Sequence, residues 1–171
     1  MKNLIYLLLV VFLFSNNIVK AQVAIGKQSI SSASVSLEFG SENRGLILPW
    51  VTNKDNVTGV VPGTFIFDSS DKKTKFKLAG DWMTLHILTT GYVDASLQDS
   101  ESENKTAKVS IGKPTNTKGI LVLEDKNKAM ILPKVQSPHD NIIKPEPGTI
   151  VFDIKTQLLA VYNGSFWEFW N

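Results

Sequence analysis

The chain carries nearly the same sequence twice, with the second copy starting about 85 residues after the first. Blocks return in the same order: residues 23–27 at 109–113, 36–38 at 122–124, 46–49 at 130–133, 62–68 at 147–153 and 80–82 at 164–167. A duplication of this kind limits the fold to something that two copies of one small unit can build. A repeated unit is also more typical of packing and interaction than of catalysis, which needs a unique set of residues.

Each copy has the pattern of β structure. Short apolar stretches are punctuated by Pro and Gly, and no stretch after residue 21 keeps a helical apolar period over three turns. The fold class predicted is all-β, as two tandem homologous modules, each a small antiparallel domain ending in a three-stranded meander. Strands are expected near 23–25, 35–39, 45–48, 64–68, 73–78 and 82–85, and again near 109–111, 120–123, 129–132, 149–153, 158–162 and 166–170. Pro49 and Pro133 lie where strands should end or form an edge.

The chain divides into four segments. Residues 1–21 have the form of a signal peptide, with Lys2 before the apolar run 4–14 and a small-residue cleavage site at Ala21. The alternative is a retained anchor, but the run is too short to span a bilayer of ~30 Å. Module 1 covers 22–88 and module 2 covers 109–171. Residues 89–108 are acidic and polar, which favours a flexible linker.

Composition excludes several function classes. Cleavage takes Lys2 and Lys20 from the 18 basic side chains, so that 16 remain against 16 acidic ones. A neutral chain has no basic stripe for phosphates, which argues against nucleic acid as a partner and against electrostatic membrane attachment. Cysteine is absent, which excludes thiol enzymes, thiolate metal sites and disulfides. No cofactor fingerprint occurs.

Few residues are candidates for chemistry. His86 and His139 are the two histidines, and neither implies a nucleophile, so both are interpreted as structural. The acidic run that begins at Asp68 could offer oxygens to calcium, but it lacks the EF-hand spacing. Asp68 and Asp153 form a matched carboxylate pair in the repeat, and turn chemistry explains both. We therefore predict no catalytic, cofactor or metal site and no enzyme.

The tryptophans are the candidate contact residues. Trp82 and Trp167 recur at equivalent positions, which favours a place in the core. Trp50 has only Lys134 as its counterpart, and Trp170 lies one residue from the end of the chain. An exposed Trp can stack on a sugar or anchor a protein partner, so Trp50 and Trp170 are predicted as partner or glycan contacts.

The repeated pattern resembles a module of exported Bacteroidota proteins of the tail-fibre-like or surface type. It falls on Ile25-Gly26, residues 45–49 and 62–68, Gly80 and Trp82, and recurs at Ile111-Gly112, 129–133, 147–153 and 162–167. Ala129 replaces a usual Gly, and Leu78 stands where Tyr162 carries the motif. The resemblance implies a cell-surface protein, with an accessory role in gliding motility or adhesion as an analogy.

The expected function is therefore a non-catalytic, exported structural or interaction protein. It would be an accessory component of an outer-membrane or cell-surface assembly. The protein would be exported through Sec and would lie in the periplasm, on the outer membrane or at the cell surface. Its partner would be a larger envelope protein, bound by strand pairing or aromatic anchoring, and a homo-oligomer is compatible with the fibre resemblance. No transmembrane segment is expected after cleavage. The alternatives are a glycan-binding module and, with least support, an enzyme that uses carboxylates between the modules.

Overall fold

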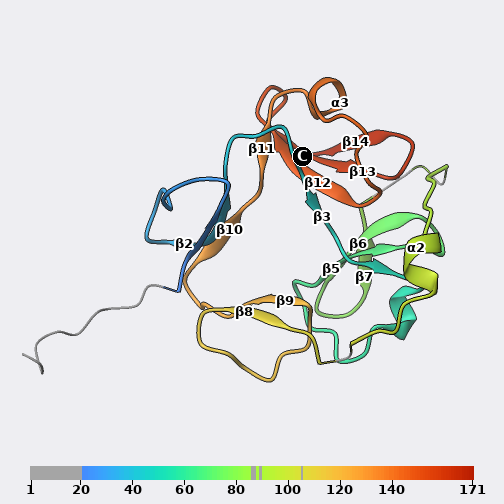
Figure 1. Ribbon diagram of the computed structural model, residues 1–171, viewed down its shortest axis with the longest axis horizontal. Helices are drawn as coiled ribbons and strands as arrows, with labels where there is room; N and C mark the ends of the chain where they lie inside the picture. Colours follow the sequence, from blue (N-terminus) through green and yellow to red (C-terminus); the bar gives the residue numbers. More distant parts are fainter. Residues whose placement is uncertain (1–20, 86–87, 89, 105) are drawn as a thin grey trace, which may run out of the picture.

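The computed structural model describes residues 21–85, 88, 90–104 and 106–171, and it is all-β with short helical turns, as the sequence predicts (Figure 1). The predicted signal peptide lies outside the described residues except for Ala21, and so does His86. The observed strands follow the predicted ones closely, because Pro and Gly mark most of the strand ends.

The first copy builds a four-stranded sheet, called here the repeat-1 sheet. Its strands are β4 (Trp50–Val51), β5 (Phe65–Asp68), β6 (Lys73–Lys77) and β7 (Trp82–Thr84). β5, β6 and β7 form the predicted antiparallel meander, and β4 joins β5 in parallel. Sequence reasoning missed β4, because it ended the preceding strand at Leu48 and expected the next strand from residue 64.

The second copy builds the repeat-2 sheet with the same strand order. Its strands are β11 (Lys134–Val135), β12 (Thr149–Asp153), β13 (Leu158–Tyr162) and β14 (Trp167–Trp170). β11 is parallel to β12, and the three others form an antiparallel meander. The two sheets therefore share one topology.

Backbone hydrogen bonds around the repeated prolines are also shared. Phe67 N–H donates to the Pro49 carbonyl, and Phe152 N–H donates to the Pro133 carbonyl, each over 2.9 Å. Each proline ends one strand, and its carbonyl accepts the first hydrogen bond of a parallel strand pair, β4 with β5 in the first copy and β11 with β12 in the second. The connection to the meander holds a helical turn in both copies, η1 (Lys54–Asn56) and α3 (Pro138–Asn141).

Two smaller sheets are parallel, which corrects the expectation of purely antiparallel modules. One contains β1 (Val23–Ile25), β2 (Val35–Phe39) and β10 (Ala129–Ile131), with β2 in the centre. The other contains only β8 (Val109–Ile111) and β9 (Leu121–Leu123). Sequence reasoning found these strands but could not give their direction, because each pair closes a wide connection rather than a hairpin turn.

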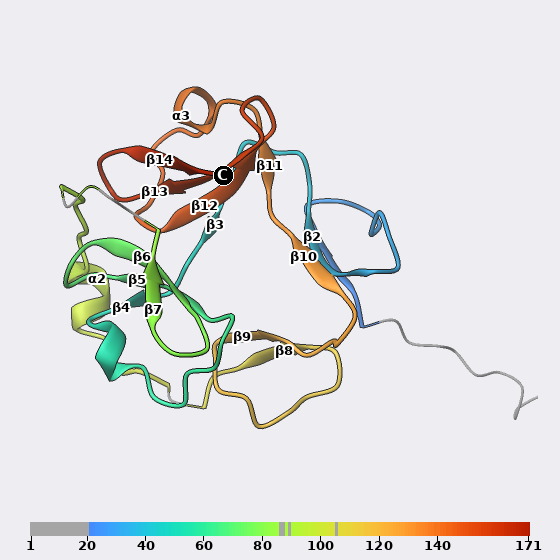
Figure 2. The ribbon, with the colours of Figure 1, turned by 180° about the vertical axis from the view of Figure 1, so that it is seen from behind.

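Strands are exchanged between the two copies. β10 from the second copy pairs with β2 from the first, and β3 (Leu46–Ile47) from the first copy pairs with β12 from the second. Figures 1 and 2 show the chain of each copy crossing to the other's sheet in this way. The predicted boundaries at residues 88 and 109 therefore do not separate the sheets from one another.

The main core lies between the repeat-1 and repeat-2 sheets. We call it core 1; its buried residues are Leu48 and Phe67 from the first copy and Ile150 and Val161 from the second. Gly148 lies at this contact with a φ of 77°, and a Cβ there would approach the Phe67 side chain to 2.9 Å. The opposite face of the repeat-2 sheet has a smaller core, core 2, made of Val135, Val151 and Ala160 with Trp167 packed against it. Of the two tryptophans predicted in the core, Trp167 is half-buried against core 2, and Trp82 is half-buried with the Lys77 ammonium 5.8 Å from its ring centroid.

The predicted linker is partly packed. Gly91 is buried, and Val93 packs against core 1. Ser165, in the turn before β14, donates a hydrogen bond to the Thr90 carbonyl over 3.0 Å. A one-turn helix, α2 (Ser96–Asp99), follows. The start of this segment therefore contacts the folded body.

Candidate interaction surface

The matched carboxylates Asp68 and Asp153 are fully buried and have the same structural role. Asp68 accepts hydrogen bonds from the backbone N–H groups of Lys54 and Ser70, at 2.9 and 3.0 Å. Asp153 accepts from the N–H groups of Ser137 and Lys155, at 3.0 and 2.9 Å. Asp68 therefore connects the start of η1 to the turn after β5, and Asp153 connects the start of α3 to the turn after β12.

The oxygens of Asp68 are occupied by donors, which leaves little support for calcium. The Lys75 ammonium lies 2.8 Å from one oxygen and is itself buried. Burial raises the pKa of Asp68, but the bonds from Lys75 and Ser70 outweigh it and lower the pKa to about 2. Burial likewise opposes the charge of Lys75, and its bonds to Asp68 and Asp71 raise its pKa. Asp68 thus acts as a structural anion, as the turn interpretation suggests.

A second repeated carboxylate closes each small parallel sheet. Glu38 pairs with Lys27 at 2.6 Å and accepts from the Ser31 N–H at 2.7 Å. Glu124 pairs with Lys108 at 2.9 Å and accepts from the N–H and hydroxyl of Thr115. The bond from the lysine in each case lowers the pKa of the glutamate to about 2. Both glutamates hold the long connection between two parallel strands.

These carboxylates predict a stability that is lost in acid. The folded-state pKa values of Glu38, Asp68 and Glu124 lie near 2, below their ordinary values of 4.5 and 3.8. A carboxylate whose pKa is lowered by folding stabilises the fold at every pH above its unfolded-state pKa, and this stabilisation is lost as the pH falls toward the folded-state pKa. We therefore expect the free energy of unfolding to be level above about pH 5 and to fall between about pH 5 and 2. Urea unfolding across this range measures it. The Glu38→Gln/Glu124→Gln double variant should show a shallower fall, and an equal fall would contradict the assignment.

Trp50 lies between the two copies rather than in solvent. Its indole N–H donates to the Pro147 carbonyl over 2.6 Å, and its ring is tilted against Phe67 with the centroids 6.5 Å apart. The side chain is half-buried against core 1. Trp50 therefore carries a structural contact, which weakens the hypothesis that it is a glycan or partner contact.

Replacement of Trp50 should measure this contact. Trp50→Phe keeps an aromatic ring but removes the N–H donor, so we expect the free energy of unfolding to fall by about 1 kcal/mol from the lost hydrogen bond, with any packing loss in addition. Urea unfolding monitored by circular dichroism provides the value. Unchanged stability would show that the indole N–H bond contributes nothing to the folded state.

Trp170 and His139 make separate contacts in the second copy. Trp170 is half-buried in β14, opposite Leu159 of β13. The His139 ring lies edge-on to Phe169 with the centroids 6.1 Å apart, and its Nε2 is 3.3 Å from an Asp140 oxygen. His139 and Asp140 are both exposed, as the structural interpretation of His139 suggests.

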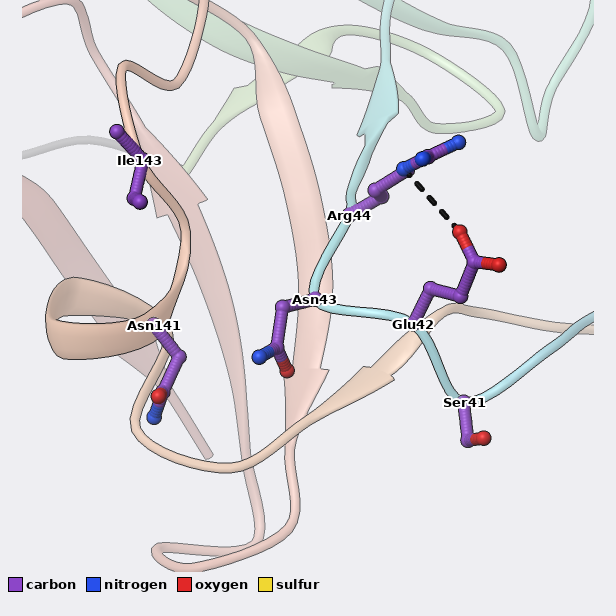
Figure 3. A pocket seen from close by; sticks show the side chains of 6 residues that line it. All are labelled: Ser41, Glu42, Asn43, Arg44, Asn141 and Ile143. Carbon is purple, nitrogen blue, oxygen red and sulfur yellow. Dashed lines mark ion pairs between the residues drawn. The ribbon is translucent and has the colours of Figure 1, made fainter.

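One hollow of the described surface is wide and shallow, with a volume of about 620 Å³. It lies between the segment before β3 and the segment after α3 (Figure 3). Arg44 and Glu42 pair over 3.2 Å and turn toward each other, away from Asn141 and Ile143 (Figure 3). The lining residues are Ser41, Glu42, Asn43, Arg44, Asn141 and Ile143. Its polar groups do not converge on a common point, so the hollow lacks the form of an enclosed ligand site.

The small parallel sheets expose apolar side chains that sequence reasoning did not single out. Val23 and Ile25 are exposed on β1, and Val109, Ile120 and Leu121 are exposed on and beside the β8–β9 pair. Parallel strands are normally covered on both faces, so this exposure is unusual. The uninterrupted apolar run from Ile120 to Leu123 was the available signal, but it reads equally well as a buried strand.

The described residues contain neither a cluster of metal-ligating side chains nor a helix that could cross a membrane. In that part of the chain, no group of three or more His, Asp or Glu residues could hold a metal ion. No helix among residues 21–85, 88, 90–104 and 106–171 is both long and apolar enough to cross a bilayer.

Comparison with protein-family models, with curated proteins and with solved structures finds no match to this chain. The candidate interaction surface therefore rests on the geometry of the small parallel sheets alone.

Proposed function

We propose that this protein is a non-catalytic, exported structural or interaction component of an outer-membrane or cell-surface assembly, of the adhesion or gliding type. The observation that carries the proposal is the exposed apolar surface of the two small parallel sheets. Strands with free edges and uncovered apolar side chains are suited to binding another protein by strand addition.

The use of the carboxylates supports a structural role. Asp68 and Asp153, the matched pair that an enzyme between the copies would use, are occupied by backbone N–H groups at 2.9 to 3.0 Å. A general acid or base needs a proton that it can exchange with a substrate, whereas these groups stay ionised and enclosed. The arrangement of these carboxylates favours a role in stabilising the fold over a role as general acid or base.

The glycan-binding alternative has less support. Both predicted contact residues, Trp50 and Trp170, are half-buried, and the Trp50 N–H is already bonded to the Pro147 carbonyl. A sugar-stacking ring must offer one face to solvent.

Site-specific photocrosslinking in the cell envelope tests the proposal. A benzophenone amino acid at Ile120, which is exposed, should form an adduct with a specific envelope protein. The same amino acid at Lys126, an exposed polar position in the same part of the chain, is the matched control. An adduct from position 120 that position 126 does not give supports the interaction role. Equal labelling at both positions, or none, would count against it.

A further inference from the structure

We propose that the free edge of β9 binds a second copy of this chain, whose β1 strand adds to the β8–β9 sheet in parallel. This inference rests on the proposed interaction function and names its first partner. It is carried by a difference between the two small parallel sheets: the first has three strands, and its counterpart in the second copy has two.

The first sheet shows what occupies the missing position. β1 and β8 are sequence counterparts, and β2 and β9 are their parallel partners. β2 has a third strand on its other edge, β10, which comes from the other copy of the repeat. Ala129 N–H donates to the Ser34 carbonyl there over 2.8 Å. The chain therefore completes one such edge with an apolar strand of its own, which points to the chain itself as the partner. β10 is the repeat counterpart of β3, so the choice of β1 for the edge of β9 rests on the exposure of β1.

The backbone of β9 has groups oriented for such an addition. Val109 N–H donates to the Ile120 carbonyl, and Glu124 N–H donates to the Ile111 carbonyl, so positions 120 and 124 face β8. Residues of a parallel strand alternate between its two edges, which turns the peptide groups of Leu121 and Leu123 to the other side. No described strand pairs with β9 on that side.

The side chains around this edge lack the features that normally block strand addition. Val109 is 59% exposed, Ile120 is 63% exposed and Leu121 is 43% exposed. Edge strands are usually protected by lysine, proline or a bulge, whereas residues 120–123 are Ile-Leu-Val-Leu. A two-stranded sheet is also marginal alone, so an added strand would stabilise it.

The strand β1 fits this edge and is itself uncovered. It reads Val23-Ala24-Ile25, with Val23 and Ile25 exposed and no charge along its length. Its pairing with β2 uses one edge, and no described strand uses the other. Addition of β1 to β9 joins two different surfaces, so the contact is head-to-tail and leads to a ring or an open chain of copies. Figures 1 and 2 place the β1–β2–β10 and β8–β9 sheets at separate positions on the molecule, which such a contact requires.

Sedimentation of the exported, purified full chain tests self-association. The wild type should form species larger than a monomer in a concentration-dependent way. The Ile120→Lys/Leu121→Lys double variant should weaken association by at least about tenfold, because each added lysine would be desolvated at the new contact. Ile154→Lys is the matched control, since Ile154 is also exposed and lies in the turn after β12. Circular dichroism must show the same folded spectrum for the wild type and both variants.

Crosslinking then identifies the strand. The chain has no cysteine, so Ile25→Cys and Ile120→Cys variants have no competing thiol. A short bismaleimide should link the two variants only when they are mixed, as a head-to-tail contact requires. A monomeric wild type, an association that the lysines leave unchanged, or linkage of Ile120→Cys only to itself would overturn the proposal. A monomer that still gives the envelope adduct from position 120 would overturn this inference but leave the proposed function standing.

Discussion

Asp153→Ala should lower the free energy of unfolding by at least about 3 kcal/mol, because buried donors would lose their acceptor at a site that water does not reach. The side chain is fully buried and accepts from two backbone N–H groups and from the Thr156 hydroxyl at 2.8 Å. Burial raises the pKa of Asp153, but the bonds from Lys155, Thr156 and Ser137 outweigh it, and the net pKa is lowered. Urea unfolding at pH 7 measures the effect.

The matched control is Asp140→Ala in the neighbouring α3 turn. Asp140 is exposed, and among the described residues its carboxylate pairs with the exposed His139, so its removal should change the free energy of unfolding by less than about 0.5 kcal/mol. Similar losses for the two variants would show that the burial and hydrogen bonds of Asp153 do not set its contribution. Asp153→Asn separates charge from shape, because the amide keeps the size but offers one acceptor oxygen instead of two.

The strands of this protein could be predicted from sequence because their signals are local. The alternation in residues 74–78 and the Asn163-Gly164 turn need only near neighbours, and the meanders built from them are present in both copies. The strands β4 and β11 were missed for the opposite reason. Each is a two-residue parallel partner of a strand well over a dozen residues further on, and no local pattern marks such a pair.

The candidate site was predictable only in part, again because of distance along the chain. The turn role of Asp68 is local, since Ser70 N–H donates to its carboxylate. The role of Trp50 is not local: its acceptor, the Pro147 carbonyl, lies in the other copy. The exposure of Ile120 depends on the number of strands beside it, which the sequence of the repeat does not reveal. The duplication predicted the recurring topology but not the exchange of strands between the copies.

Because the two copies exchange the strands β3 and β10, we expect that neither half of the chain folds alone. Core 1 draws Leu48 and Phe67 from the first copy and Ile150 and Val161 from the second, so either half alone exposes its share. Leu48 N–H also donates to the Gly148 carbonyl across this contact. Residues 109–171 alone would lose β3 from the edge of β12, and residues 22–108 alone would lose β10 from β2. A separate 60-residue domain is already marginal without such losses.

The expected result is a poorly dispersed NMR spectrum for residues 109–171 alone and for residues 22–108 alone. Mixing the two fragments should restore dispersion, because the contacts that hold the copies together are noncovalent and span the break. A fragment that cannot form the contact is the control: Gly148→Val in 109–171 adds a branched side chain at a φ of 77°, where even a Cβ comes within 2.9 Å of Phe67. This variant should fail to restore the spectrum. A well-dispersed spectrum for residues 109–171 alone would instead establish the second copy as an independent module, with the exchanged strands contributing little to its stability.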